Sequence, residues 1–302
     1  MGSYVVERHI SHALYGGVWL CRYKGRQSAV KRCEIIAHSS SSLTCVEDME
    51  YIRADIESEK SVNVELAKHR HKHILHMDDH FERDGFQHLV FEYCPNGDLL
   101  AEMKGLPDAR FPQPRAIHYF RQVVAAVAHL HNNGFAHRDL SLENVLLDKH
   151  GNCKVCDFGL AVAVPSIQTD GPVGKLNYMA PEVHAEAAYD PCAADMWSLG
   201  MMLFIMITGV PLVHVPDESD KRFCILTQFG VLSLVNRWKM DGLFSEPVLE
   251  LIERMLEVDP AKRIDIHALK KALSRLRRQV HPFEFRSTPQ TRLGRFLRKW
   301  FL

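Results

Sequence analysis

The chain has 302 residues, 46% of them hydrophobic and 25% charged, which is the composition of a globular protein large enough for two lobes or domains. Its 37 basic and 37 acidic residues balance, which argues against a nucleic-acid binder that relies on a strong basic field. No secretory signal opens the sequence and its eight cysteines are scattered, so we expect a protein of the reducing cytoplasm.

The N-terminal part of the chain predicts a β-rich unit. Apolar runs of strand length, separated by glycine-containing turns, occur at residues 4–10, 18–23 and 28–33. A serine run at 39–42 is typical of a loop insertion. Residues 46–68 are rich in Glu and lack proline, so they predict a helix. Further apolar runs at 74–77 and 88–93 complete this part.

The remainder of the chain is predominantly helical. The Cys-Pro-Asn-Gly sequence at 94–97 breaks the chain, and we interpret it as a hinge between two lobes. Apolar residues then recur at helical spacing from Ile117 to Leu130, and Gly134 ends that helix. Strand-like runs return only at 144–147 and 152–156. The apolar run at 196–210 is too short to span a bilayer, so we expect a buried core helix and no transmembrane segment.

The pattern that bears most on function is a set of acidic and amide residues on two predicted loops. His137-Arg138-Asp139 is followed by Asn144, and then by Asp157-Phe158-Gly159. Phosphoryl transfer from ATP needs a carboxylate that accepts a proton from the incoming hydroxyl, together with oxygen ligands for Mg²⁺. Single Asp and Asn residues are often turn formers, but this trio in this order favours a catalytic site.

With these motifs the chain resembles the eukaryotic protein kinase family, of the Ser/Thr type, over roughly residues 4–275; a calcium/calmodulin-dependent-kinase-like subtype is one option. Further matching motifs are Val30-Lys31, Phe91-Glu92-Tyr93-Cys94, Ala180-Pro181-Glu182, Asp195-Met196-Trp197-Ser198-Leu199-Gly200 and Asp259-Pro260-Ala261-Lys262-Arg263. The resemblance implies an α+β, bilobal protein kinase fold. A small β-rich N-lobe with one main helix would occupy residues 1–93, a larger, mostly helical C-lobe 94–279, and a basic aromatic tail 280–302.

The resemblance also implies transfer of the γ-phosphate of ATP to Ser or Thr of protein substrates, with Mg²⁺ as cofactor. Asp139 would be the catalytic base, and Asn144 and Asp157 would bind the metal. Lys31 would hold the α- and β-phosphates. The rest of the ATP site would consist of Ile10, Ser11, Ala13, Gly16, Val18, Ala29, Phe91, Glu92, Cys94, Asp98 and Leu146.

Structural contacts follow from the same resemblance. Arg263 would pair with Glu182, and Asp195 would brace the catalytic loop. An apolar stack that assembles in the active state would contain Leu66, Met77, His137 and Phe158.

The sequence departs from the family in its phosphate lid and in the partner of Lys31. Ser11 and Ala13 stand where the lid usually has glycines, so we expect a stiffer lid. The usual glutamate position falls at Val62, with Glu59 and Glu65 three residues to either side. We favour Glu65 as the partner; the alternative is that both glutamates are solvated.

A third departure concerns the residues around Asp139. Ser141 stands where Ser/Thr kinases usually carry a lysine, and Lys175 stands where they usually carry a threonine. We interpret this as a compensating exchange, in which Lys175 brings a positive charge near the γ-phosphate and Ser141 bonds near Asp139, so that both take part in catalysis. The alternative is that Lys175 is a solvated loop lysine.

Regulation and partners are less strongly marked. Arg138 suggests a switch by phosphorylation of Ser166 or Thr169, which implies an upstream activating kinase; an unmodified loop is the alternative. The tail mixes arginine with large apolar residues, so it could contact a partner or an anionic membrane surface, or pack on the lobe. The departures also leave open a pseudokinase, a scaffold that binds partners without phosphotransfer.

Two patterns resemble metal sites without being convincing ones. Cys153 and Cys156 have zinc-type spacing, but no second pair accompanies them, and strand residues three apart face opposite sides. The histidines between His69 and His80 are better explained as solvated side chains. We therefore expect no metal at either place.

Overall fold

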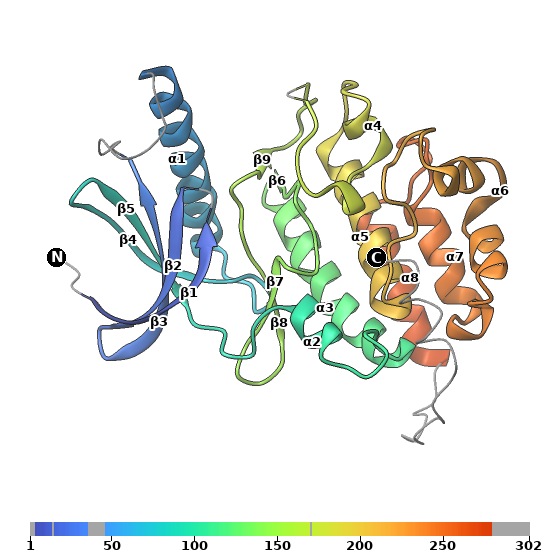
Figure 1. The fold of residues 1–302 in the computed structure, drawn as a ribbon, viewed down its shortest axis with the longest axis horizontal. Helices are drawn as coiled ribbons and strands as arrows, with labels where there is room; N and C mark the ends of the chain where they lie inside the picture. Colours follow the sequence, from blue (N-terminus) through green and yellow to red (C-terminus); the bar gives the residue numbers. More distant parts are fainter. Residues whose placement is uncertain (1–3, 14, 36–45, 170, 280–302) are drawn as a thin grey trace.

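The computed structural model describes residues 4–13, 15–35, 46–169 and 171–279. The predicted serine-rich insertion and the basic aromatic tail lie outside the described residues. Figure 1 shows a sheet with one long helix beside it, next to a larger helical part, which confirms the α+β, bilobal architecture.

The smaller part is a five-stranded antiparallel sheet in the order β1-β2-β3-β5-β4. Helix α1 (Val46–Lys68) runs alongside it (Figure 1). Val30, Leu89 and Val90 on the central strands are fully buried, which fits their β-branched or bulky apolar side chains. The strands are β1 (Tyr4–Ala13), β2 (Gly16–Tyr23), β3 (Arg26–Glu34), β4 (Met77–Arg83) and β5 (Phe86–Glu92).

The observed strands differ from the expected runs by two residues or fewer at each end, except β4 and the end of β1. β4 begins at Met77, where the apolar run 74–77 ends, and continues through polar residues because it lies at the sheet edge with one face toward solvent. Leu75 instead donates its backbone N–H to the carbonyl of Val155 in the helical part, at 2.8 Å. β1 continues to Ala13 because its pairing with β2 extends to Gly16.

The larger part consists mainly of helices. Short antiparallel pairs, β6 (Phe135–Ala136) with β9 (Val162–Ala163) and β7 (Val145–Leu147) with β8 (Cys153–Val155), lie where it faces the sheet. The helices are α2 (Leu99–Lys104), α3 (Gln113–Asn132), η1 (Leu176–Tyr178), α4 (Pro181–His184), α5 (Pro191–Thr208), α6 (Lys221–Arg237), η2 (Asp241–Leu243), α7 (Glu246–Met255) and α8 (Ile266–Gln279).

Helix α5 forms the centre of this part. Within the described residues it is the one helix long and apolar enough to cross a bilayer, but 89% of it is buried inside the protein, as the expected core helix would be. Asp190 caps its first turn by accepting from the N–H of Cys192, and Gly209 ends it with a left-handed φ of 80°. A Cβ at Gly209 would lie 2.7 Å from the carbonyl oxygen of Ala109, so this position requires glycine.

A buried ion pair joins the start of α4 to the loop before α8. The guanidinium of Arg263 contacts both carboxylate oxygens of Glu182, at 2.6 and 3.0 Å, which confirms the expected pair. The Arg263 side chain is completely buried and that of Glu182 is 9% exposed. A buried bidentate pair fixes the end of the segment that leads from Asp157-Phe158-Gly159 to α4.

This pair predicts a large loss of stability on removal of one partner. Glu182→Ala leaves a buried guanidinium without its carboxylate, and we expect the free energy of unfolding to fall by about 3 kcal/mol. Urea denaturation followed by circular dichroism measures it. Lys262→Ala removes the exposed neighbouring pair with Asp259 and should leave the transition unchanged. Equal effects of the two substitutions would contradict the prediction.

Candidate active site

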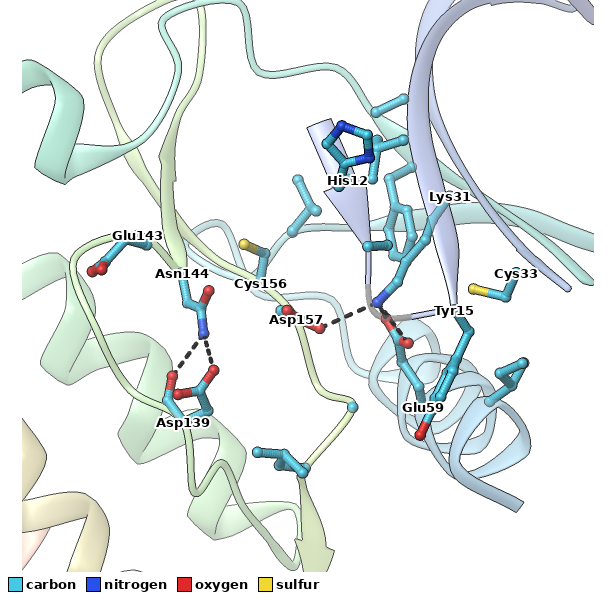
Figure 2. A pocket seen from close by; sticks show the side chains of 18 of the residues that line it. His12, Tyr15, Lys31, Cys33, Glu59, Asp139, Glu143, Asn144, Cys156 and Asp157 are labelled. Atoms are coloured by element: carbon cyan, nitrogen blue, oxygen red, sulfur yellow. Dashed lines mark hydrogen bonds and ion pairs between the residues drawn. The ribbon is translucent and has the colours of Figure 1, made fainter. Parts of the chain in front are cut away.

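A cavity of about 440 Å³ lies between the sheet and the helical part (Figure 2). The sequence-predicted site residues that line it are Ala13, Val18, Ala29, Lys31, Phe91, Asp139, Asn144, Leu146 and Asp157. Its apolar wall comes from both sides, because Ala29 on β3 and Leu146 on β7 pack against one buried cluster that contains Phe91. A cavity with an apolar wall and charged groups at one end suits a nucleotide.

Other predicted site residues do not line this cavity: Ile10, Ser11, Gly16, Glu65, Glu92, Cys94, Asp98, Ser141 and Lys175. Asp98 and Glu92 have partners elsewhere. The Asp98 carboxylate caps α2 by accepting from the N–H of Ala101 at 2.7 Å. The Glu92 carboxylate accepts from the ammonium of Lys154 at 2.7 Å. Any part they take in nucleotide binding stays a prediction.

The sequence reasoning missed several lining residues, of which Tyr15 is the most informative. Tyr15 lies in the turn between β1 and β2, and its hydroxyl donates to Asp55 on α1 at 2.6 Å. This hydrogen bond attaches the β1–β2 turn, which is the predicted phosphate lid, to α1. The other lining residues that the prediction left out are His12, Cys33, Asp55, Ile56, Glu59, Leu75, Glu143, Gly159 and Leu160; of these, Glu59 had been weighed against Glu65 as the partner of Lys31.

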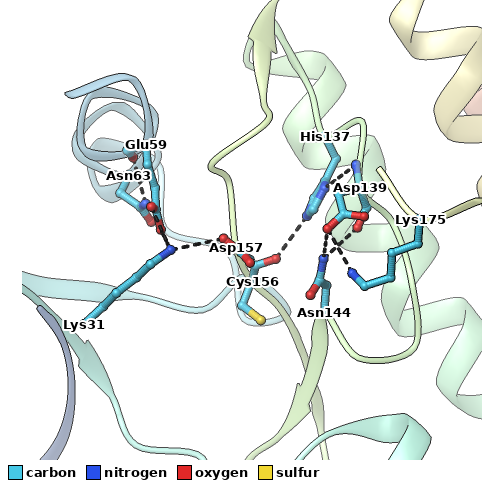
Figure 3. Close-up of polar contacts among 9 residues, drawn as sticks. All are labelled: Lys31, Glu59, Asn63, His137, Asp139, Asn144, Cys156, Asp157 and Lys175. Atoms are coloured by element: carbon cyan, nitrogen blue, oxygen red, sulfur yellow. Dashed lines mark hydrogen bonds and ion pairs between the residues drawn. The ribbon is translucent and has the colours of Figure 1, made fainter. Parts of the chain in front are cut away.

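Lys31 is held by two carboxylates at the charged end of the cavity. Its ammonium donates to both oxygens of Glu59 at 2.8 Å, and to Asp157 at 3.3 Å (Figures 2 and 3). Burial alone would lower the pKa of Lys31, but Glu59 and then Asp157 outweigh it and raise the pKa above its ordinary value. Lys31 therefore stays charged and fixed in position.

The choice of Glu65 as this partner is wrong. Six residues of helix rotate a side chain by about 600°, so Glu59 and Glu65 project roughly 120° apart and only one can face β3. Glu59 is 5% exposed and faces Lys31, whereas Glu65 pairs with Lys68 at 2.5 Å on the solvent side. Val62, at the position counted from the family, is a buried core residue.

The catalytic-loop residues form a compact polar group. The side-chain amide of Asn144 donates to the Oδ2 of Asp139 at 2.7 Å and to its carbonyl oxygen at 2.8 Å (Figure 3). Asp139 Oδ1 is buried with no hydrogen-bond partner among the described residues. An unsatisfied buried carboxylate oxygen is costly in a protein interior, and such groups are retained at functional sites.

Lys175 and Ser141 meet beside Asp139, as the exchange hypothesis requires. The Lys175 ammonium lies 2.9 Å from Asp139 Oδ2 and 3.1 Å from Ser141 Oγ. Lys175 is thus no solvated loop lysine in this structure. The role of its charge in a reaction stays a prediction.

Asn144 and Asp157 fit a divalent cation. The Asn144 amide nitrogen is committed to Asp139, which leaves its oxygen free to face a ligand. The Asp157 side chain is 48% exposed. Burial works to raise the Asp157 pKa, but Lys31 outweighs it and lowers the pKa, so the carboxylate is ionised. Oxygen donors of this kind suit Mg²⁺.

Elsewhere the metal-like patterns have ordinary partners. Among the described residues no group of three or more His, Cys, Asp or Glu side chains is placed to hold a metal. His73 is 6% exposed, so it is not the solvated side chain that was expected, and its ring bonds the backbone carbonyl of Cys153.

The Asp195 carboxylate fixes the backbone at the start of the catalytic loop. Its carboxylate accepts from the backbone N–H groups of His137 and Arg138, each at 2.8 Å, and contacts the ring of His131 at 2.8 Å. The expected bracing role is therefore observed. The His137 ring packs on Phe158 with centroids 5.3 Å apart, which joins two members of the expected apolar stack. Leu66 lies in the same buried cluster as Phe158, and Met77 in a neighbouring one.

The chain belongs to the protein kinase family. The sequence pattern described as the protein kinase domain matches residues 4–273. CBL-interacting protein kinase 4 of rice is 31% identical over 89% of this chain and 56% of its own length. CBL-interacting serine/threonine-protein kinase 18 of Arabidopsis thaliana is 30% identical over 90% and 49%. An Aurora kinase of Yarrowia lipolytica is 28% identical over 76% and 60%. The chain spans about half the length of the two plant relatives.

The contacts of Asp195 predict how stability varies with pH. Burial alone would lower the pKa of His131, but Asp195 raises it from 6.5 to about 10. Because folding raises this pKa, His131 contributes its full stability below about pH 6.5 and loses it as the pH rises toward 10. Urea midpoints should therefore fall between about pH 6.5 and pH 9 in the wild type.

His131→Gln should lower stability at pH 6.5 and flatten this fall. His267→Gln removes an exposed histidine and should keep the slope of the wild type. An unaltered slope in His131→Gln would show that another group titrates.

The position of Glu59 predicts the effect of neutralising it. Glu59→Gln removes the charge that holds Lys31, so we expect binding of Mg-ATP, measured by calorimetry, to weaken about tenfold. Glu65→Gln is the matched control on the same helix and should bind as the wild type does. If Glu65→Gln weakened Mg-ATP binding more than Glu59→Gln did, Glu65 would be the partner of Lys31 instead.

Proposed function

We propose that this protein is an ATP-dependent kinase that phosphorylates Ser or Thr residues of protein substrates. The observation that carries the proposal is the convergence of Lys31, Glu59, Asp139, Asn144 and Asp157 on one cavity. The membership in the protein kinase family supports it, and so does the serine/threonine-protein kinase name of the Arabidopsis relative.

Each of these residues has a place in the reaction. An acceptor hydroxyl oxygen would form a bond to the γ-phosphorus while the bond from that phosphorus to the bridging oxygen breaks and ADP leaves. The hydroxyl proton would pass to the Asp139 carboxylate. Lys31 would bind the inner phosphates. A magnesium ion bound by Asn144 and Asp157 would neutralise phosphate charge.

Asn144 also orients the base. Its two hydrogen bonds, to the carboxylate and to the carbonyl oxygen of Asp139, fix the carboxylate relative to its own backbone. A base that is already in position pays little reorganisation entropy when the substrate binds.

A phosphorylation switch through Arg138 belongs to the same proposal. The Arg138 guanidinium donates to the side-chain oxygen of Gln168 at 3.3 Å, and Gln168 in turn donates to the hydroxyl of Ser166 at 2.8 Å. Thr169 is exposed in the same segment. A phosphate on Ser166 or Thr169 would contact the Arg138 guanidinium and hold the segment more firmly. An upstream kinase would place it.

The pseudokinase alternative has little to support it. Its strongest arguments were an absent partner for Lys31 and an altered charge at Asp139, but Glu59 supplies the partner and Lys175 supplies a charge. The comparisons also favour a kinase.

Transfer of phosphate from Mg-ATP to a Ser/Thr peptide library tests the proposal. The full chain should label peptides, and Asp139→Asn should reduce the rate by at least about 10²-fold, because it removes the proton acceptor. Binding of Mg-ATP by Asp139→Asn should persist, which separates a catalytic from a folding defect. A folded wild type that binds Mg-ATP but labels nothing, even after treatment with an activating kinase, would refute the proposal in favour of a scaffold.

A further inference from the structure

The positive charge next to the catalytic base comes from an unexpected part of the chain. Lys175 lies outside the catalytic loop that carries Asp139, Ser141 and Asn144, and directly precedes η1 on the segment that leads to α4. Figure 3 shows Lys175 reaching Asp139 from the side opposite to Lys31. The base and its cation therefore belong to two segments that meet only in the folded structure.

Lys175 places a positive charge directly beside Asp139, where the acceptor hydroxyl would react. Lys31 is committed to Glu59 and Asp157, whereas the Lys175 ammonium has one charged partner, Asp139, and one neutral partner, Ser141. Its side chain is 38% exposed, against 15% for Asp139. An ammonium at a half-exposed site beside the base can turn toward an incoming phosphate without leaving the hydroxyl of Ser141.

The position of Lys175 depends on how its segment docks. Gly174, with a left-handed φ of 86°, passes so close to the catalytic loop that a Cβ there would lie 2.6 Å from the carbonyl oxygen of Arg138. On the other side of Lys175, the hydroxyl of Ser198 in α5 donates to the carbonyl oxygen of Tyr178 at 2.8 Å. The hydroxyl of Tyr178 donates to Glu143 at 3.3 Å.

We propose that Lys175 is the catalytic cation for the γ-phosphate, and that docking of residues 171–178 gates phosphotransfer because this segment carries it. The inference rests on the proposed kinase function. As the hydroxyl oxygen bonds to the γ-phosphorus, the bond to ADP breaks and the proton passes to Asp139, Lys175 stabilises the negative charge on the transferring group. Ser141 is a positioning residue that steers the ammonium.

Variants at residues 141 and 175 test whether a lysine charge beside Asp139 is needed for phosphotransfer. Lys175→Ala should lower kcat by about 10²-fold or more while the Kd for Mg-ATP changes by less than about threefold, since the lost contact forms mainly in the transition state. Moving the lysine to the catalytic loop, in the double variant S141K/K175S, should restore kcat to within about tenfold of the wild type. Lys149→Ala, at an exposed lysine of the β7–β8 turn, is the matched control and should leave kcat unchanged.

A wild-type kcat in Lys175→Ala would overturn the inference while leaving the kinase function intact. A double variant as slow as Lys175→Ala would overturn the charge assignment. A wild type that binds Mg-ATP but transfers no phosphate would instead refute the proposed function. The three results are therefore distinguishable.

A second measurement tests the gating. Ser198→Ala removes the hydroxyl that docks Tyr178, without touching the cavity. In the wild-type background, Ser198→Ala should lower the rate of ATP hydrolysis measured in the absence of peptide. This readout is chosen because it does not depend on peptide docking on the segment. In S141K/K175S the same substitution should have several-fold less effect, because the lysine no longer resides on the segment. Equal effects in both backgrounds would overturn the gating.

Discussion

The buried carboxylate of Asp195 is the contact on which the rest of the site depends. It accepts hydrogen bonds from two successive backbone N–H groups of the catalytic loop, and the left-handed φ of 66° at Arg138 is tolerated in that setting. A fully buried charge is costly unless it is paired and hydrogen-bonded, and His131 completes the pairing. The loop that holds Asp139 is therefore fixed to α5, of which 89% is buried.

From this anchor the site extends in two directions. One leads through His137 and Phe158 to α1, which carries Glu59 and so positions Lys31. The other leads through Asp139 to Lys175, and from there along the segment to Glu182 and Arg263. Groups from both lobes thus reach one cavity, and both routes start from α5 at the centre of the helical part.

The sequence predicted the residues whose roles depend on short, fixed spacings. Asp139, Asn144 and Asp157 lie on two short loops that flank β7 and β8, so their separation along the chain determines their positions closely. Glu65 was wrongly favoured over Glu59 because the partner's position depends on the length of the connection from α1 to β4, which a count along the chain cannot supply. His12 was missed because β1 has two register shifts, between Val6 and Arg8 and between His9 and Ser11, which disturb the alternation of faces. Tyr15 was missed because it lies in the turn after β1, where no such alternation applies.

The contact between Tyr15 and Asp55 would affect how a nucleotide enters and leaves the proposed site. Asp55 and Glu59 lie one turn apart on α1, so the lid turn and the carboxylate that holds Lys31 are attached to the same turn of helix. A displacement that lifted the lid would pull on that turn. Release of product and loosening of the Lys31 pair would then be a single motion, and compounds that bind under a raised lid would find Lys31 without its partner.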